Sequence, residues 1–138
     1  MNSWKKLYCR TFQAALKAAL PFLPYRKPKI VGSVRDIPDI LIQKRCSRVL
    51  IVTDEGIRKA GLTKRLQKAL SDNGIPYSIY DKTVANPTTA NVNEAMEMYI
   101  SGGCNAIIGF GGGSSMDCAK ALGVRIARPN SSLAKMKG

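Results

Sequence analysis

The sequence contains no histidine, and its four cysteines are scattered without a Cys-x-x-Cys pair. Protein zinc and iron sites rely on these two residue types at close spacing, so we expect no metal site built by this chain alone. Cys104 and Cys118 lie in apolar segments and are expected to behave as small core residues with free thiols. Free thiols favour a reducing, cytoplasmic setting.

A long uninterrupted apolar run is also missing. The most apolar stretch, residues 7–23, is interrupted by Arg10 and Lys17 and is stopped by Pro21. It therefore lacks the roughly twenty apolar residues that a membrane-spanning helix needs. Residues 1–28 are instead expected to form a basic amphipathic helix followed by a proline-rich linker. We favour packing of this helix over a targeting role or membrane contact, although all three remain open.

Acidic residues are missing from the first 35 positions, which hold eight basic residues, whereas the remainder holds fourteen basic and nine acidic residues. The net charge of +13 creates a field that attracts phosphate-bearing ligands. Nucleic-acid modules usually interleave aromatic with basic residues, but here Trp4, Tyr8 and Tyr25 are confined to the basic N-terminal stretch. We therefore expect a solvated basic surface and no nucleic-acid partner.

The rest of the chain has the composition of one globular domain, with 138 residues in all and 45% hydrophobic residues. From residue 29 to residue 138, strand-like and helix-like segments alternate. Strands are expected at 29–34, 48–53, 76–80 and 105–110, with helices over 36–45, before Asn73-Gly74, from Asn91 and after Gly113. This order predicts an α/β domain: a Rossmann-like parallel sheet with flanking helices.

The helix expected from Asn91 has a specific start signal, since Asn91 and Glu94 have the spacing of a capping box. In an open parallel sheet the strand ends converge on one edge, where ligands bind. Asp54, the loop around Asn86 and the glycine run Gly111-Gly112-Gly113 follow the expected strands at 48–53, 76–80 and 105–110. We expect these three loops to meet.

The glycine run carries the strongest chemical signal because it joins a buried strand to a helix. Glycine lets the backbone approach phosphate oxygens, and the helix beyond presents unpaired N–H groups to the anion. The pattern is neither the Rossmann fingerprint nor a Walker A loop, since Lys120 lies seven residues after Gly113. Phosphoryl transfer is therefore disfavoured, and a glycine loop that merely makes a tight turn is the alternative. Asp117 is expected to bond loop amides or a ribose hydroxyl.

Asp54 allows two interpretations that the sequence leaves open. A carboxylate at the end of an early strand is placed to accept hydrogen bonds from the adenosine ribose, and it would disfavour a 2′-phosphate. An aspartate before a helix also caps that helix by accepting from backbone amides, here near Gly56 and Ile57.

Three blocks of this sequence resemble the iron-containing (group III) alcohol dehydrogenase family. GFGGGSSMDCAKALG is similar to the family signature GGGSxxDxAK, and VLIVTDEGIRKAGL and DKTVANPTTANV match two further blocks in the same order. The resemblance spans residues 29–138. Glycerol dehydrogenases and dehydroquinate synthases share the glycine loop in altered form and are the alternative relatives.

The resemblance implies an N-terminal NAD(P)-binding domain followed by a helical domain whose aspartate and three histidines hold a divalent metal, iron or zinc. Asp54 would then contact the adenosine ribose, which favours NAD with NADP as the alternative, and Asn86 would lie near the cofactor. Lys120 also matches the signature, but its place inside the helix suggests a structural role. The pyrophosphate would be held by Gly112, Gly113, Ser114, Ser115, Met116 and Asp117.

The resemblance has one large departure, because no position here matches the family's metal-binding histidines. We therefore expect a chain truncated at its C-terminal end, with no catalytic residue of its own and no hydride transfer alone. The longer protein would form homo-oligomers and interconvert alcohols with aldehydes or ketones. A basic nucleotide-binding or nucleic-acid-binding module without catalysis is the competing hypothesis.

Overall fold

The computed structural model describes residue 11 and residues 28–129. The chain divides into two units, Met1–Ile30 and Val31–Gly138. The amphipathic helix expected within residues 1–28 lies almost wholly outside the described residues. The architecture below is that of the second unit.

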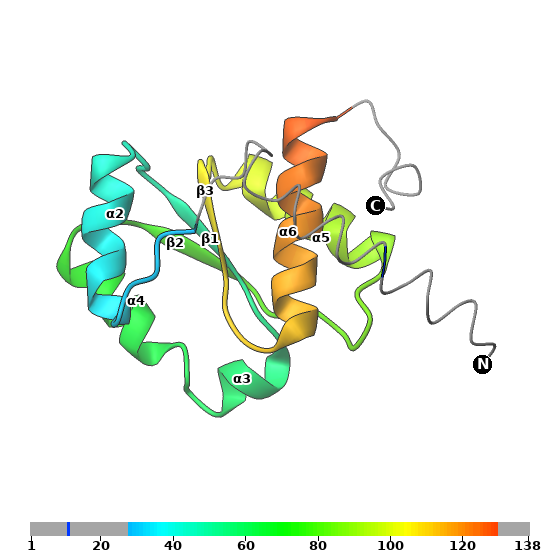
Figure 1. The fold of residues 1–138 in the computed structure, drawn as a ribbon, viewed down its shortest axis with the longest axis horizontal. Coiled ribbons are helices and arrows are strands. Elements are labelled where there is room, and N and C mark those ends of the chain that lie inside the picture. The colour runs from blue at the N-terminus through cyan, green and yellow to red at the C-terminus, as the bar shows by residue number, and fades with distance from the viewer. Residues whose placement is uncertain (1–10, 12–27, 130–138) are drawn as a thin grey trace. The chain divides into compact units, whose positions relative to one another are not determined.

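A parallel sheet of three strands forms the centre of this unit (Figure 1). Its strands are β1 (Val49–Val52), β2 (Tyr77–Tyr80) and β3 (Ala106–Gly109), arranged in the order β2-β1-β3. Val49 pairs with Tyr77 on one side and with Ala106 on the other, and both pairings are parallel. The predicted α/β parallel sheet with flanking helices is confirmed.

Helices cover both faces of the sheet, with α2 (Ile37–Gln43) and α4 (Lys64–Asp72) on one side and α5 (Thr89–Ser101) and α6 (Gly113–Ala127) on the other (Figure 1). Side chains of a strand alternate between the two faces. Val49 and Ile51 accordingly join the core that includes Leu66 of α4, whereas Leu50 and Val52 join the second core, beside α5 and α6. Both faces of β1 are therefore apolar, which is the sequence pattern of a strand covered by helices on both sides.

Between β1 and β2 the chain forms two helices, α3 (Glu55–Lys59) and α4. Gly61 separates them in the left-handed region with φ 70°. Leu62, directly after this glycine, is 55% exposed. The predicted end of α4 is confirmed, because Asn73 is its C-cap residue and Gly74 has φ 66°.

The prediction of a strand at residues 29–34 is wrong. The Ser33 hydroxyl accepts a hydrogen bond from the Arg35 amide at 3.1 Å and opens a short 3-10 helix, η2 (Val34–Asp36), which leads into α2. Ile30 is 91% exposed. A strand needs a neighbouring strand for its backbone groups, and within residues 28–129 no strand pairs with this segment.

The start of α5 also differs from the prediction. Its N-cap is Thr88, whose hydroxyl accepts from the Asn91 amide at 3.3 Å while the Asn91 side-chain oxygen accepts from the Thr88 amide at 3.1 Å. The capping box therefore joins Thr88 to Asn91, not Asn91 to Glu94. Asn91 is buried and also donates to the Tyr80 hydroxyl and the Lys82 carbonyl, so it fixes the chain that follows β2.

None of the helices in the described part of the chain combines the length and the hydrophobicity required to cross a membrane.

Candidate functional site

The loops that follow the three strands meet at the carboxyl edge of the sheet. Asp54, after β1, forms an isolated antiparallel bridge with Lys82, after β2. The Thr83 amide donates to the Thr53 carbonyl at 3.4 Å, and the Phe110 amide, after β3, donates to the Val52 carbonyl at 2.8 Å. The predicted convergence is confirmed, and the loop after β1 lies between the other two.

The glycine run begins α6 without a capping side chain. Gly112 is the N-cap residue and Gly113 the first helical residue, and no side chain of the described chain bonds the first amides. Those amides have no partner within the helix, and the helix dipole adds positive potential at the same place. A Cβ added at Gly112 or Gly113 would meet no heavy atom within 4 Å. The loop therefore presents bare backbone donors to open space, as an anion site requires.

Two neighbouring glycines have a different surrounding. A Cβ at Gly109 would lie 2.9 Å from the Cβ of Ala119 in α6. Gly111 has φ 138°, and a Cβ there would lie 2.9 Å from the Ser115 hydroxyl oxygen. Because they have no side chain, these two glycines allow β3 and the loop after it to approach α6 closely.

Asp54 caps α3, because its Oδ1 accepts from the Ile57 amide at 2.9 Å. The N-cap interpretation is thus confirmed. Its second oxygen, Oδ2, accepts from the Ser115 hydroxyl at 3.3 Å, which links the loop after β1 to the first turn of α6. Asp54 as a whole is half-buried. Contact with a ribose stays a prediction.

The remaining residues of the signature point in different directions. Ser114 is half-buried at the second position of α6, Ser115 is fully buried and Met116 is 46% exposed. Asp117 lies on the solvent side of the helix, where its carboxylate pairs with Lys120 Nζ at 3.5 Å. Among the described residues, Asp117 makes no bond to the loop amides. The alternative, a bond to a ribose hydroxyl, stays a prediction.

Asn86 lies in the exposed loop between β2 and α5 and adopts the left-handed region with φ 55°. Asparagine tolerates this conformation better than most residues. No hydrogen bond found in the described chain joins Asn86 to Asp54 or to the glycine run. The structure therefore places it on a loop at the correct edge without bringing it into contact with the other predicted residues.

Two ties at this edge were not predicted. Arg58 of α3 bonds the Asp81 carboxylate at 2.6 Å, which fixes α3 against the loop after β2. The Ser115–Asp54 bond is the second tie. Neither shows in the sequence, because both depend on side chains far apart in the chain.

Beneath the site, α6 packs on a buried core that includes Cys118 and Leu122. Cys118 is fully buried and free, as is Cys104 at 7% exposure, which confirms the expectation of core thiols. Burial raises the pKa of the Cys118 thiol above its ordinary value. Burial likewise raises the pKa of the Tyr80 hydroxyl.

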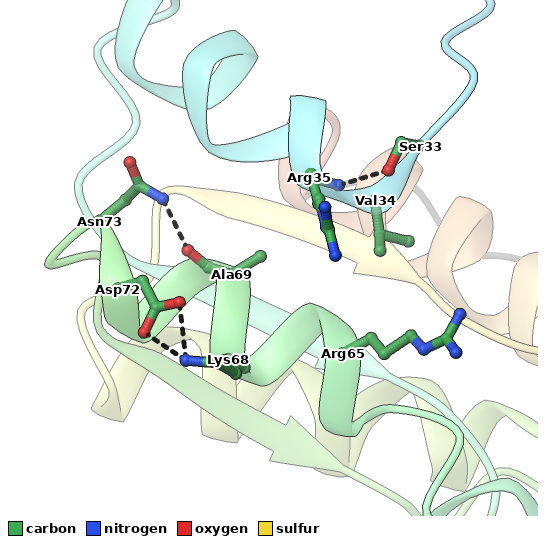
Figure 2. Close-up of a pocket in the computed structure, with 8 residues that line it drawn as sticks. All are labelled: Ser33, Val34, Arg35, Arg65, Lys68, Ala69, Asp72 and Asn73. Carbon is green, nitrogen blue, oxygen red and sulfur yellow. Dashed lines mark hydrogen bonds and ion pairs between the residues drawn. The ribbon is translucent and has the colours of Figure 1, made fainter.

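A pocket of about 640 Å³ lies away from this edge, between η2 and α4 (Figure 2). Arg35, Arg65 and Lys68 give it a basic lining. Lys68 is paired with Asp72 at 3.0 Å, as the dashed lines in Figure 2 mark. This pocket was not predicted from the sequence, because it depends on the packing of η2 on α4.

In the described part of the chain, no group of three histidine, cysteine, aspartate or glutamate side chains is arranged to hold a metal ion. The metal that the family resemblance implies therefore has no fitting ligand set among these residues.

Comparisons with known proteins agree with the observed α/β fold. The family model for iron-containing alcohol dehydrogenases matches residues 30–137. Choline dehydrogenase of Bacillus subtilis is 37% identical over 103 residues, covering 75% of this chain and 26% of the relative. The chain thus spans about a quarter of that relative's length.

Solved structures share the fold. A crystal structure of 1,3-propanediol oxidoreductase superimposes with a TM-score of 0.71 at 28% identity, covering 76% of this chain and 27% of that protein. Sulfoacetaldehyde reductase from Bifidobacterium kashiwanohense, solved in complex with NAD+, gives 0.66 at 26% identity, covering 78% of this chain and 28% of its own. With its glycine loop, its sheet and its sequence in agreement, the chain belongs to the iron-containing alcohol dehydrogenase family.

Proposed function

We propose that the carboxyl edge of this sheet binds NAD, and that the chain supplies the cofactor-binding part of a dehydrogenase that interconverts alcohols with aldehydes or ketones. One observation carries the proposal: Gly112 and Gly113 leave open space at the uncapped N-terminus of α6, beside the Asp54 carboxylate. A relative solved with NAD+ shares the fold, which supports the same ligand here.

The pyrophosphate is assigned to the start of α6. Its negative charge suits the free amides and the positive end of the helix dipole. The absence of side-chain atoms at Gly112 and Gly113 lets the oxygens approach the backbone. Ser114, at the second helical position, is assigned as an additional hydroxyl donor. Met116 and Asp117 are more exposed and are assigned to the rim of this site.

The adenosine ribose is assigned to Asp54. Each carboxylate oxygen has about two acceptor positions, so the bonds from Ile57 and Ser115 leave capacity for ribose hydroxyls. A 2′-phosphate would meet like charge at this carboxylate, which favours NAD over NADP. Asn86 is assigned to the neighbouring wall of the site.

When bound, the nicotinamide ring would exchange a hydride with the alcohol carbon of the substrate. The described residues contribute binding and orientation of the cofactor, and we derive no metal-dependent step through them. The divalent metal and the groups that select the alcohol are assigned to the part of the longer relatives that this chain does not match.

Titration of the 138-residue chain with NADH, followed by the fluorescence of the reduced nicotinamide, tests the proposal. We expect saturable binding that inorganic pyrophosphate displaces. Ser114→Ala should weaken it by about tenfold, since a hydrogen bond to a charged group contributes about 1.5 kcal/mol. No binding by the unmodified folded chain would overturn the proposal.

The competing function, a basic module that binds nucleotides or nucleic acid without regard to the glycine loop, is favoured by the pocket between η2 and α4. The double variant Arg35→Gln/Arg65→Gln removes two of its cations and serves as the matched control. Our proposal expects NADH binding to survive in this control. Loss of NADH binding there, with normal binding in Ser114→Ala, would favour the competing function.

A further inference from the structure

Ser115 stands out within the signature because its side chain faces the protein interior. It is fully buried, and its hydroxyl donates to Asp54 Oδ2 at 3.3 Å. The same oxygen occupies the space that a Cβ on Gly111 would need. A side chain so enclosed is not placed to touch a ligand at the mouth of the loop. Its hydroxyl acts on Asp54 instead.

The Asp54 carboxylate is held from two directions. The Ile57 amide of α3 donates to Oδ1, and the Ser115 hydroxyl of α6 donates to Oδ2. With one donor a carboxylate can still turn about its terminal torsion, which is broad and soft. With a donor on each oxygen the plane of the carboxylate is fixed, and each oxygen keeps an acceptor position for another group.

From this geometry we infer that Ser115 is a positioning residue that fixes the Asp54 carboxylate and thereby sets the preference for NAD over NADP. The inference rests on the proposed function, in which Asp54 meets the adenosine ribose. A fixed carboxylate accepts from the 2′-hydroxyl of NAD in a single orientation and repels the 2′-phosphate of NADP. A carboxylate that is free to rotate would bind the 2′-hydroxyl less tightly and repel the 2′-phosphate less strongly.

The link also joins the two halves of the proposed site. Asp54 belongs to the loop after β1, whereas Ser115 belongs to the helix that begins at the glycine run. One hydrogen bond therefore holds the ribose carboxylate at a set position relative to the amides assigned to the pyrophosphate. A purely space-filling Ser115 would support the glycine run and would affect both dinucleotides equally.

The experiment is a double-mutant cycle on the 138-residue chain with Ser115→Ala, Asp54→Ala and the combined variant. NADH and NADPH dissociation constants are measured by nicotinamide fluorescence, and the readout is their ratio. Ser115→Ala should reduce the preference for NADH about fivefold, corresponding to about 1 kcal/mol for the lost hydrogen bond. Asp54→Ala should remove the preference, and the combined variant should match Asp54→Ala because Ser115 then has nothing to position.

Three results would overturn the inference: an unchanged ratio in Ser115→Ala, an equal weakening of both dinucleotides, or a further fall of the ratio when Ser115→Ala is added to Asp54→Ala. Thermal unfolding of each variant confirms that it is folded. Should Ser115→Ala not fold, Ser115→Cys keeps the shape with a weaker donor and should shift the ratio in the same direction. Absence of NADH binding in the unmodified chain would instead refute the proposed function itself, so the two failures are distinguishable.

Discussion

A Cβ added at Gly109 or Gly111 would contact α6, whereas a Cβ added at Gly112 or Gly113 would enter open space. The first pair, which we call the closed glycines, lies against Ala119 and Ser115 of α6. The second pair, the open glycines, lies at the uncapped start of that helix. The contrast teaches that one short glycine motif meets two separate demands, namely close packing of a strand on a helix and free access to backbone amides.

If this division is correct, substitutions at the closed glycines lower the stability of the fold. Substitutions at the open glycines leave the stability unchanged and weaken the binding of NADH.

Gly111→Ala should have the largest effect on stability. Its φ of 138° is a conformation that side chains rarely adopt, and the new Cβ would lie 2.9 Å from the Ser115 hydroxyl oxygen. Backbone strain of this kind costs about 1–3 kcal/mol, and the contact adds to it. We expect the free energy of unfolding, measured in urea, to fall by about 3 kcal/mol. A loss no greater than that of Gly113→Ala would break the comparison.

Gly109→Ala should follow, with a loss of about 2 kcal/mol from overpacking against Ala119. Ala119→Gly removes the opposing methyl group and is itself destabilising by about 1 kcal/mol in a helix. The double variant should therefore be more stable than the sum of the two single losses implies. Strict additivity in urea unfolding would show that β3 and α6 do not meet at this point.

The burial of Cys118 beneath α6 should also appear as a dependence of stability on pH. Burial raises the pKa of the Cys118 thiol in the folded chain. The unfolded chain then loses this proton first, so the stabilising contribution is complete below the ordinary thiol pKa and is lost as the pH rises toward the folded one.

As the pH rises above the ordinary thiol pKa, the stability of Cys118→Ala should fall less steeply than that of the unmodified chain. The comparison uses the slope with pH, because the substitution also removes packing and lowers stability at every pH. Identical slopes in the two proteins would contradict the burial of the Cys118 thiol beneath α6.

Gly112→Ala and Gly113→Ala should have the smallest effects on stability, within about 0.5 kcal/mol, since the added methyl groups meet no atom within 4 Å. Neither position has a left-handed backbone in the structure. Thermal unfolding measures both variants directly. A loss comparable to that of Gly109→Ala would mean that the open glycines are structural as well.

Much of the fold follows from the sequence because its signals are local. The apolar run of β1, the Asn73-Gly74 end of α4 and the glycine run before α6 each depend on neighbouring residues, and each was predicted. The prediction of a strand at residues 29–34 was wrong for a non-local reason. The composition of this segment suits a strand, but no neighbouring strand pairs with it in the described chain. The start of α5 was misplaced because Thr88 and Asn91 share a capping box that local spacing alone did not single out.

The candidate site divides in the same way. Asp54 and the glycine run were predicted from their places at strand ends, and the structure brings them together through Ser115. The inward direction of Ser115 and the outward pairing of Asp117 with Lys120 depend on how α6 is rotated against the sheet. The rotation of a helix about its axis is set by tertiary packing. The sequence motif therefore predicted ligand contact for residues 112–117 alike, without showing which side chains face inward or outward.

NADH binding and thermal unfolding, measured together in Gly113→Val, separate the role of the open glycines in binding from any role in stability. A valine side chain there fills the open space at the start of α6 without meeting another described residue at its Cβ. We expect a melting temperature close to that of the unmodified chain and an NADH affinity reduced at least tenfold, the equivalent of about 1.4 kcal/mol. Unchanged NADH affinity in the folded variant would contradict the proposed role in binding.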